Sequence, residues 1–166
     1  PSAVTLGWIA VAVVILAFPA GSTLVKSSHA PAVMLAFWRM LMATALWNLA
    51  LMISGRHISW ADVRRAAIPG VMFGLNIMLF FLGVTNNAIA NAELIGALSP
   101  FLIVPVGARF FGERIYPKAV ALALVAFSGL LLVLFAAPAS GTASLKGNVF
   151  SILSMVAWVT YMATTR

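Results

Sequence analysis

The sequence predicts an all-α fold, a polytopic bundle of transmembrane helices. Of its 166 residues, 63% are hydrophobic and only 8% are charged, whereas soluble domains carry about 25% charged residues. Apolar runs long enough to cross a bilayer core as a helix, about 20 residues, recur along the chain. They lack the polar–apolar alternation of membrane barrel strands. The absence of cysteine excludes disulfides, thiol catalysis and cysteine-based metal sites.

We interpret six runs as spans: residues 5–26, 31–54, 66–84, 88–111, 119–137 and 148–163. The first lacks the basic start of a signal peptide and is followed by further apolar runs, so it is read as a span. The second contains Arg39 and the fourth contains Glu93. The third contains Gly70 and Gly74 in GxxxG spacing, interpreted mainly as tight helix packing, with Asn76 just beyond.

Three prolines lie well inside these runs, Pro19 in the first and Pro100 and Pro105 in the fourth. Each removes a backbone hydrogen bond from its helix. In transporters such breaks expose carbonyl groups to substrates, but a proline also produces static kinks. The sequence leaves both interpretations open.

Basic residues between the runs predict orientation, because Lys and Arg concentrate in cytoplasmic loops. Three lie in 55–65, three in 109–118 and one at Arg166, which places seven on one side, whereas only Lys26 and Lys146 lie on the other. We therefore attribute the net charge of +7 to membrane orientation and expect no nucleic-acid partner. The expected location is the inner (plasma) membrane, multi-pass, with a cytoplasmic N-terminus.

Glu93 is the candidate functional residue of the fourth run. Its helix face, within about 60°, contains small or apolar residues: Gly96, Ala97, Pro100, Val104, Gly107 and Ala108. Small residues mark faces that pack against protein, so we expect Glu93 to face a cavity or a neighbouring helix. Arg39 lies at a similar depth, and an intramembrane charge usually has a function and a partner. The sequence leaves open whether the two pair, or whether Glu93 contacts headgroup water while Arg39 snorkels outward.

The sixth run is similar in sequence pattern to the first. With an offset of 140, residues 7–26 align without gaps to 147–166, which places Gly7 opposite Gly147. The sixth run would then begin a second copy of a five-helix unit, and that copy would be inverted because five is odd. We expect a first repeat over 5–137, and over 138–166 a loop and the first helix of a truncated second repeat. A chain from Pro1 to Arg166 would be a fragment on this reading.

Two segments near the N-terminus carry recognisable motifs. In AFPAGSTLVK, Phe18 and Pro19 precede Lys26, and in PAVMLAFWRMLMA, Pro31 precedes Arg39. They place a basic residue late in the first span and another early in the second.

A third segment, ALSPFLIVPVGARFFGERI, runs from Pro100 in mid-helix to Gly112 and Glu113 at the helix end. In this order and spacing the three segments resemble EamA-type transporters of the drug/metabolite transporter (DMT) superfamily, over essentially the whole chain. The chain departs from the family where Phe18 and Pro19 replace a Trp-Gly pair.

The resemblance implies ten helices in two inverted five-helix repeats, with a substrate path between them. It also implies a secondary transporter, not an enzyme, that exports or takes up small metabolites, amino acids or drugs by alternating access without a cofactor. Expected partners are the lipid bilayer, a small-molecule substrate and either the missing second repeat or a second copy in a homodimer. The candidate substrate-binding residues are Arg39, Asn76, Glu93, Pro100 and Phe18.

Within this hypothesis, Arg39 would compensate Glu93 or an anionic group of the substrate. Glu93 would bind a cationic group or a proton, so proton coupling is part of the hypothesis. Two other function classes stay open. A non-transporting membrane scaffold or assembly subunit would use the small-residue faces but leaves the intramembrane charges unexplained. An intramembrane enzyme would need a nucleophile, base or metal cluster within the spans, and the sequence shows no such arrangement.

Overall fold

The computed structural model describes residues 3–136 and 144–165, without the side chains of residues 3, 16, 18, 19, 119, 130 and 133–136. The described chain folds into seven helices: α1 (Ala3–Ser27), α2 (Ala32–Ile53), α3 (Trp60–Asn86), α4 (Ile89–Ala97), α5 (Ser99–Phe111), α6 (Pro117–Ala136) and α7 (Leu145–Thr164). No strand occurs in either described range. The predicted all-α polytopic bundle is therefore confirmed.

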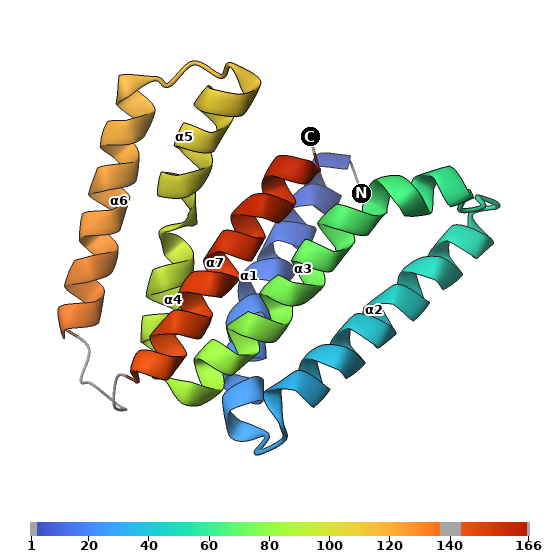
Figure 1. Cartoon of the computed structure of the whole chain (residues 1–166), viewed down its shortest axis with the longest axis horizontal. Coiled ribbons are helices and arrows are strands. Elements are labelled where there is room, and N and C mark those ends of the chain that lie inside the picture. Colours follow the sequence, from blue (N-terminus) through green and yellow to red (C-terminus); the bar gives the residue numbers. More distant parts are fainter. Residues whose placement is uncertain (1–2, 137–143, 166) are drawn as a thin grey trace.

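The helices run up and down, and apart from the α4–α5 break in mid-bundle, successive connections lie at opposite ends (Figure 1). Five segments of the described chain are long and apolar enough to cross a membrane: Val4–Ser27, Ala32–Ile53, Trp60–Asn86, Ile89–Phe111 and Leu145–Thr164. α4 and α5 together form one of these segments. α6 contributes the shorter apolar stretch Val120–Gly129, and the predicted run 119–137 ends outside the described residues.

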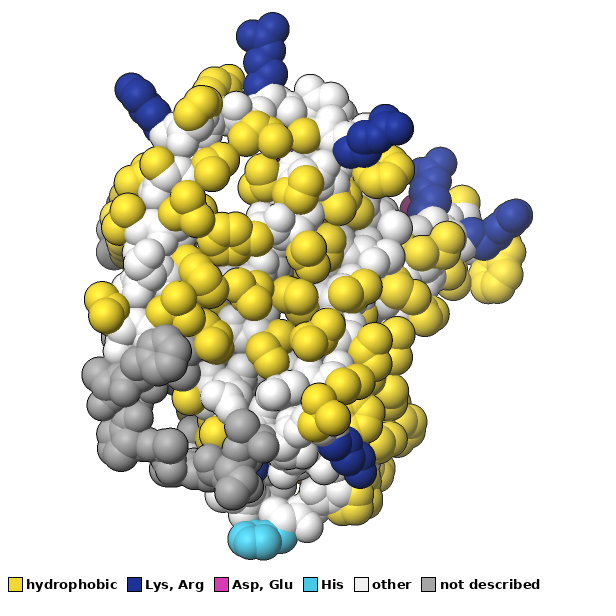
Figure 2. All heavy atoms as spheres, turned by 60° about the vertical axis from the view of Figure 1, so that its left-hand side comes forward, with side chains coloured by type: hydrophobic (Ala, Val, Ile, Leu, Met, Phe, Trp, Pro, Cys, Tyr) yellow, Lys and Arg dark blue, Asp and Glu magenta, His cyan; other side chains and the backbone are white. Residues whose placement is uncertain are grey.

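The outer surface fits a lipid environment. Figure 2 shows hydrophobic side chains over most of one face, with Lys and Arg side chains at its ends and most of them at one end. The α2–α3 and α5–α6 connections, which adjoin most of the basic residues, lie at the same end of the bundle (Figure 1). The bundle thus has the charge asymmetry expected from the sequence, while the cytoplasmic N-terminus stays a prediction.

Local sequence explains where the helices begin and end. α3 starts with a capping box in which the Ser59 side chain accepts from the Asp62 backbone N–H and the Asp62 carboxylate accepts from the Ser59 N–H. α5 ends at Gly112, whose φ of 66° lies in the left-handed region that glycine adopts without strain. These signals define where α3 begins and where α5 ends.

The helix expected over 88–111 is two helices, because it breaks at Leu98. Pro100 has no N–H to donate to the carbonyl of Gly96, four residues earlier. At the break, the Leu98 N–H instead bonds the Ile95 carbonyl at 3.1 Å, a tighter turn than an α-helix makes. The break also alters the expected helix face: Gly96 stays on the face of Glu93, whereas Pro100 is exposed.

The most extensive helix–helix contact joins α3 and α7, which lie side by side through the middle of the bundle (Figure 1). Two glycines allow the approach. A Cβ atom at Gly83 would lie 2.4 Å from Ser151 Oγ, and one at Gly147 would lie 2.8 Å from the Asn86 carbonyl oxygen. Close packing of this kind is what small residues provide between membrane helices.

The described residues provide no packing partner for the GxxxG match. A Cβ atom added at Gly70 or at Gly74 would meet nothing within 4 Å among the described residues. Gly70 lies in the first half of α3 and Gly74 near its middle, both away from the close approach to α7 at Gly83. GxxxG spacing permits a close approach, but a neighbouring helix must also lie against it.

Candidate functional site

Glu93 faces protein. The residue is half-buried on α4, and its Oε1 accepts a 2.6 Å hydrogen bond from the Ser22 hydroxyl on α1. Hydrogen bonds to an ionised carboxylate are stronger than neutral ones, particularly away from water. The Ser22 side chain is itself buried, with 4% of its surface exposed. Glu93 therefore has a polar partner on a neighbouring helix.

Glu93 lines a cavity of about 1030 Å³. Its walls come mainly from α1, α2, α3, α4 and α7, and its polar side chains are Ser22, Ser28, Arg39, Asn76, Glu93, Ser99, Ser151 and Ser154. Aromatic side chains, among them Phe73 and Trp158, form much of the apolar wall. Ligand pockets combine apolar walls with a few convergent polar groups in this way, with volumes of roughly 300–1,000 Å³.

Arg39 reaches the same cavity from α2. Its guanidinium lies 5.5 Å from the centroid of the Phe81 ring on α3, a cation–π distance. No ion pair joins Arg39 to Glu93, both of which are described residues. The sequence left open whether Arg39 and Glu93 pair. In this conformation they do not: Arg39 lies over the Phe81 ring, and Glu93 accepts from Ser22.

Asn76 both lines the cavity and holds α7. Its Nδ2 donates to the backbone oxygen and to Oγ of Ser154, each at 2.9 Å. In return, Ser154 Oγ donates to the Asn76 carbonyl oxygen at 3.1 Å. Interhelical polar contacts of this type satisfy groups that lipid cannot. The aromatic rings of Phe73, Trp158 and Tyr161 pack beside this contact, with Phe73 and Tyr161 centroids 5.1 Å apart.

The structure brings together three of the five predicted site residues: Arg39, Asn76 and Glu93. Pro100, in the first turn of α5, is exposed and does not line the cavity. The side chain of Phe18 lies outside the described part of the structure. No group of three or more His, Asp or Glu residues in the described chain could hold a metal ion.

Sequence reasoning missed the serines. Ser22, Ser151 and Ser154 are all nearly buried, with 4%, 1% and 3% of their surfaces exposed. The sequence contains a signal at the sixth run: Gly147, just before it, and Ser151 and Ser154 within it follow one another at helical spacing on a single face. Small polar residues in this pattern mark a helix interface inside a membrane.

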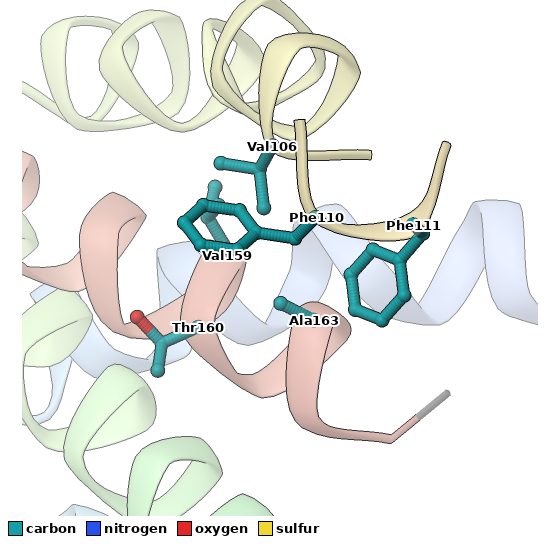
Figure 3. A pocket seen from close by; sticks show the side chains of 6 residues that line it. All are labelled: Val106, Phe110, Phe111, Val159, Thr160 and Ala163. Atoms are coloured by element: carbon teal, nitrogen blue, oxygen red, sulfur yellow. The ribbon is translucent and has the colours of Figure 1, made fainter. Parts of the chain in front are cut away.

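A second, smaller cavity of about 310 Å³ lies between α5 and α7. In Figure 3, Val106, Phe110 and Phe111 of α5 lie opposite Val159, Thr160 and Ala163 of α7. Its lining includes no charged side chain. It therefore lacks the groups that orient a polar ligand, and the larger cavity is the candidate site.

Comparison with known proteins gives a consistent result. The model of the EamA-like transporter family matches residues 2–135. Two curated relatives, the pseudopaline exporter CntI of Pseudomonas aeruginosa strain UCBPP-PA14 and that of strain PAO1, are each 33% identical over 119 residues. This match covers 70% of the chain but 42% of each relative, so the chain spans less than half of their length. No solved structure matches the chain significantly.

Proposed function

Since the chain belongs to the EamA-like transporter family, we propose that it forms the N-terminal part of a secondary transporter that exports a small polar metabolite by alternating access. Membership of this DMT family supports a multi-pass membrane transporter rather than an enzyme. The observation that supports the substrate path is the cavity of about 1030 Å³ with Arg39, Asn76 and Glu93 in its wall.

Charge inside the membrane is the main physical argument. Charged side chains in membrane spans are costly and mark substrate or ion pathways. Glu93 and Arg39 carry opposite charges and line one cavity without pairing. Each is therefore available to a substrate group of opposite charge, and a proton exchanged at Glu93 would couple transport to a proton gradient.

The relatives favour export over uptake. Both are named as exporters of pseudopaline, and their similarity covers 70% of the chain. Transfer of that direction to this protein is part of the proposal. Pseudopaline is the natural first substrate for a test.

The rest of the transporter would complete the cavity. Arg39 and Ala97 line the cavity, yet both are exposed in this chain. In transporters with inverted repeats, the substrate site lies between the two repeats near the bilayer midplane. We therefore propose that α7 begins a second repeat, whose remaining helices cover the exposed cavity wall. A second copy of the chain would be the alternative cover.

Efflux from cells expressing the complete reading frame tests this function. Glu93→Gln removes the charge and keeps the shape, and we expect pseudopaline efflux to fall about tenfold, because hydrogen bonds to charged groups contribute about 1.5–3 kcal/mol. Glu113→Gln, the same chemical change at the end of α5 and outside the cavity lining, is the matched control. Efflux and pH dependence unchanged by Glu93→Gln would remove Glu93 from the mechanism.

A further inference from the structure

Lys26, at the end of α1, reaches across to the end of α3. Its ammonium Nζ donates hydrogen bonds to three backbone oxygens, those of Val84 at 2.9 Å, Thr85 at 3.3 Å and Asn87 at 2.6 Å. An ammonium group has three protons to donate, so these three carbonyls account for all of them. We call these three oxygens the α3 carbonyl cluster.

The α3 carbonyl cluster receives its positive charge from another helix, α1. The last four carbonyls of a helix have no partner within it, and together they carry a partial negative charge. The last turn of α3 contains no basic residue. Val84 and Asn87 are 0% and 2% exposed, so water has little access to satisfy their oxygens. The ammonium of Lys26 fills this role.

The Asn87 side chain extends the junction to two more helices. Its Oδ1 accepts from the backbone N–H of Ala88, just before α4, at 3.0 Å and from that of Ser144, just before α7, at 3.3 Å. Its Nδ2 donates to Asn148 Oδ1 on α7. Lys26 therefore completes a junction at which α1, α3, α4 and α7 meet, and these four helices also form most of the cavity wall.

Helix α1 contributes a residue to both contacts: Lys26 to the junction and Ser22 to the hydrogen bond with Glu93. Ser22 and Lys26 are four residues apart on α1, which is helical from Ala3 to Ser27, and residues with this spacing share a helix face. A movement of α1 that separates Ser22 from Glu93 would therefore also pull Lys26 out of the carbonyl cluster. The two contacts are expected to form and break together.

We propose that the α3 carbonyl cluster is a monovalent-cation site that the protein fills with its own Lys26 ammonium, and that this occupancy keeps the adjoining end of the cavity closed. Backbone carbonyls at helix C-terminal ends coordinate monovalent coupling ions in some secondary transporters. Here a tethered ammonium replaces the free ion. The inference rests on the proposed transport function, because it assigns the contact to one state of the transport cycle.

Thiol labelling of a cavity cysteine tests the closure. A Cβ atom at Gly21 meets nothing within 4 Å, and Gly21 lines the cavity, so Gly21→Cys serves as the reporter. It is placed in the complete protein, with any cysteine outside this segment replaced. A membrane-impermeant maleimide is applied to right-side-out and to inverted vesicles, which tests both orientations. Lys26→Ala is expected to speed labelling from the Lys26 end about tenfold, as loss of a charged hydrogen-bonding partner implies.

Methylammonium distinguishes a cation site from general loosening. Lys26→Ala leaves room for this small ion in the carbonyl cluster, and its addition is expected to restore the slow labelling rate. Lys146→Ala is the matched control, because Lys146 lies at the same end but contacts the Phe150 ring, 6.0 Å away, and not the cluster. Lys26→Arg keeps a charged donor and is expected to label slowly without methylammonium.

Two results would overturn the proposal: a labelling rate that Lys26→Ala leaves unchanged, or a faster rate that methylammonium does not slow. If Lys26→Ala does not fold, Lys26→Gln, which keeps length and polarity but not charge, provides the same comparison. Labelling requires no transported substrate. If the protein does not export pseudopaline, the labelling result can therefore still be interpreted. If the cation site does not exist, the efflux assay still tests the proposed function.

Discussion

Ser22 and Glu93 lie 71 positions apart in the sequence, and a 2.6 Å hydrogen bond joins the Ser22 hydroxyl to the Glu93 carboxylate. The bond connects α1 to α4 in the wall of the cavity of about 1030 Å³. It gives an intramembrane carboxylate an uncharged hydrogen-bonding partner. Arg39, which carries the opposite charge, lies over the Phe81 ring instead. The carboxylate is therefore held without being neutralised.

Removal of the Ser22 hydroxyl should weaken transport. Ser22→Ala leaves the Glu93 carboxylate without its partner on α1, and a lost hydrogen bond to a charged group costs about 1.5–3 kcal/mol. We expect pseudopaline efflux to fall about tenfold, with Ser22→Thr retaining most of it. Ser128→Ala is the control, because Ser128 Oγ bonds only within its own helix, to the Leu124 carbonyl. Equal efflux in Ser22→Ala and Ser128→Ala would show that the contact has no role in transport.

Gly147→Ala should destabilise the bundle. The added Cβ atom would lie 2.8 Å from the Asn86 carbonyl oxygen and 2.6 Å from Asn87 Cβ, so α7 would have to move away from α3. Overpacking of this kind costs about 1–3 kcal/mol, seen as a lower unfolding temperature in detergent. Gly74→Ala, where a Cβ atom meets nothing within 4 Å, should be close to neutral. The packing argument fails if both variants unfold at the same temperature.

The sequence is sufficient to predict the membrane-spanning helices because the signals for them are local. Apolar length and the low content of charge predict membrane spans without any knowledge of neighbours. The fourth run shows the limit of that reasoning. A projection that treats the run as one continuous helix extends the face of Glu93 past Leu98, where the helix in fact breaks. That projection places Pro100 on a face that it does not share.

The candidate site was only partly predictable because its contacts join distant positions. Glu93, Arg39 and Asn76 were found since polar groups in apolar runs are conspicuous. The partners Ser22 and Ser154 were missed, because a serine in a membrane helix can bond its own backbone, as Ser128 does. Only the arrangement of the helices shows which serines face a partner across an interface. In the same way, only the arrangement of the helices shows that no described residue packs against Gly70 and Gly74.

Asn76 and Ser154 should be energetically coupled. Asn76 Nδ2 donates to Ser154 Oγ across the α3–α7 interface, and either single alanine variant removes this side chain–side chain bond. The other two bonds end on backbone oxygens and each depends on one side chain alone. A double-mutant cycle with Asn76→Ala and Ser154→Ala should give a coupling free energy of about 0.6–1.7 kcal/mol, the size typical of such bonds between membrane helices. The same cycle with Asn76→Ala and Ser128→Ala should give none. Additive effects of Asn76→Ala and Ser154→Ala would contradict the contact.

Pro100→Ala should slow transport without loss of stability. An alanine restores the N–H that a continuous helix would donate to the Gly96 carbonyl, so α4 and α5 should join across Leu98. The protein is then expected to unfold at the same or a higher temperature, because a helix interior favours alanine over proline by about 3 kcal/mol. Efflux should nevertheless decrease if α4, with Glu93, has to move relative to α5 during the transport cycle.

A second proline of the same span provides the control for this variant. Pro105 lies within α5, where the helix continues past it, so Pro105→Ala should change the unfolding temperature without the same loss of efflux. The comparison separates a hinge from a static kink, the two interpretations that the sequence left open. If Pro100→Ala transports as fast as the unmodified protein, α4 and α5 move as one element, and the break at Leu98 serves only to aim Glu93 at Ser22.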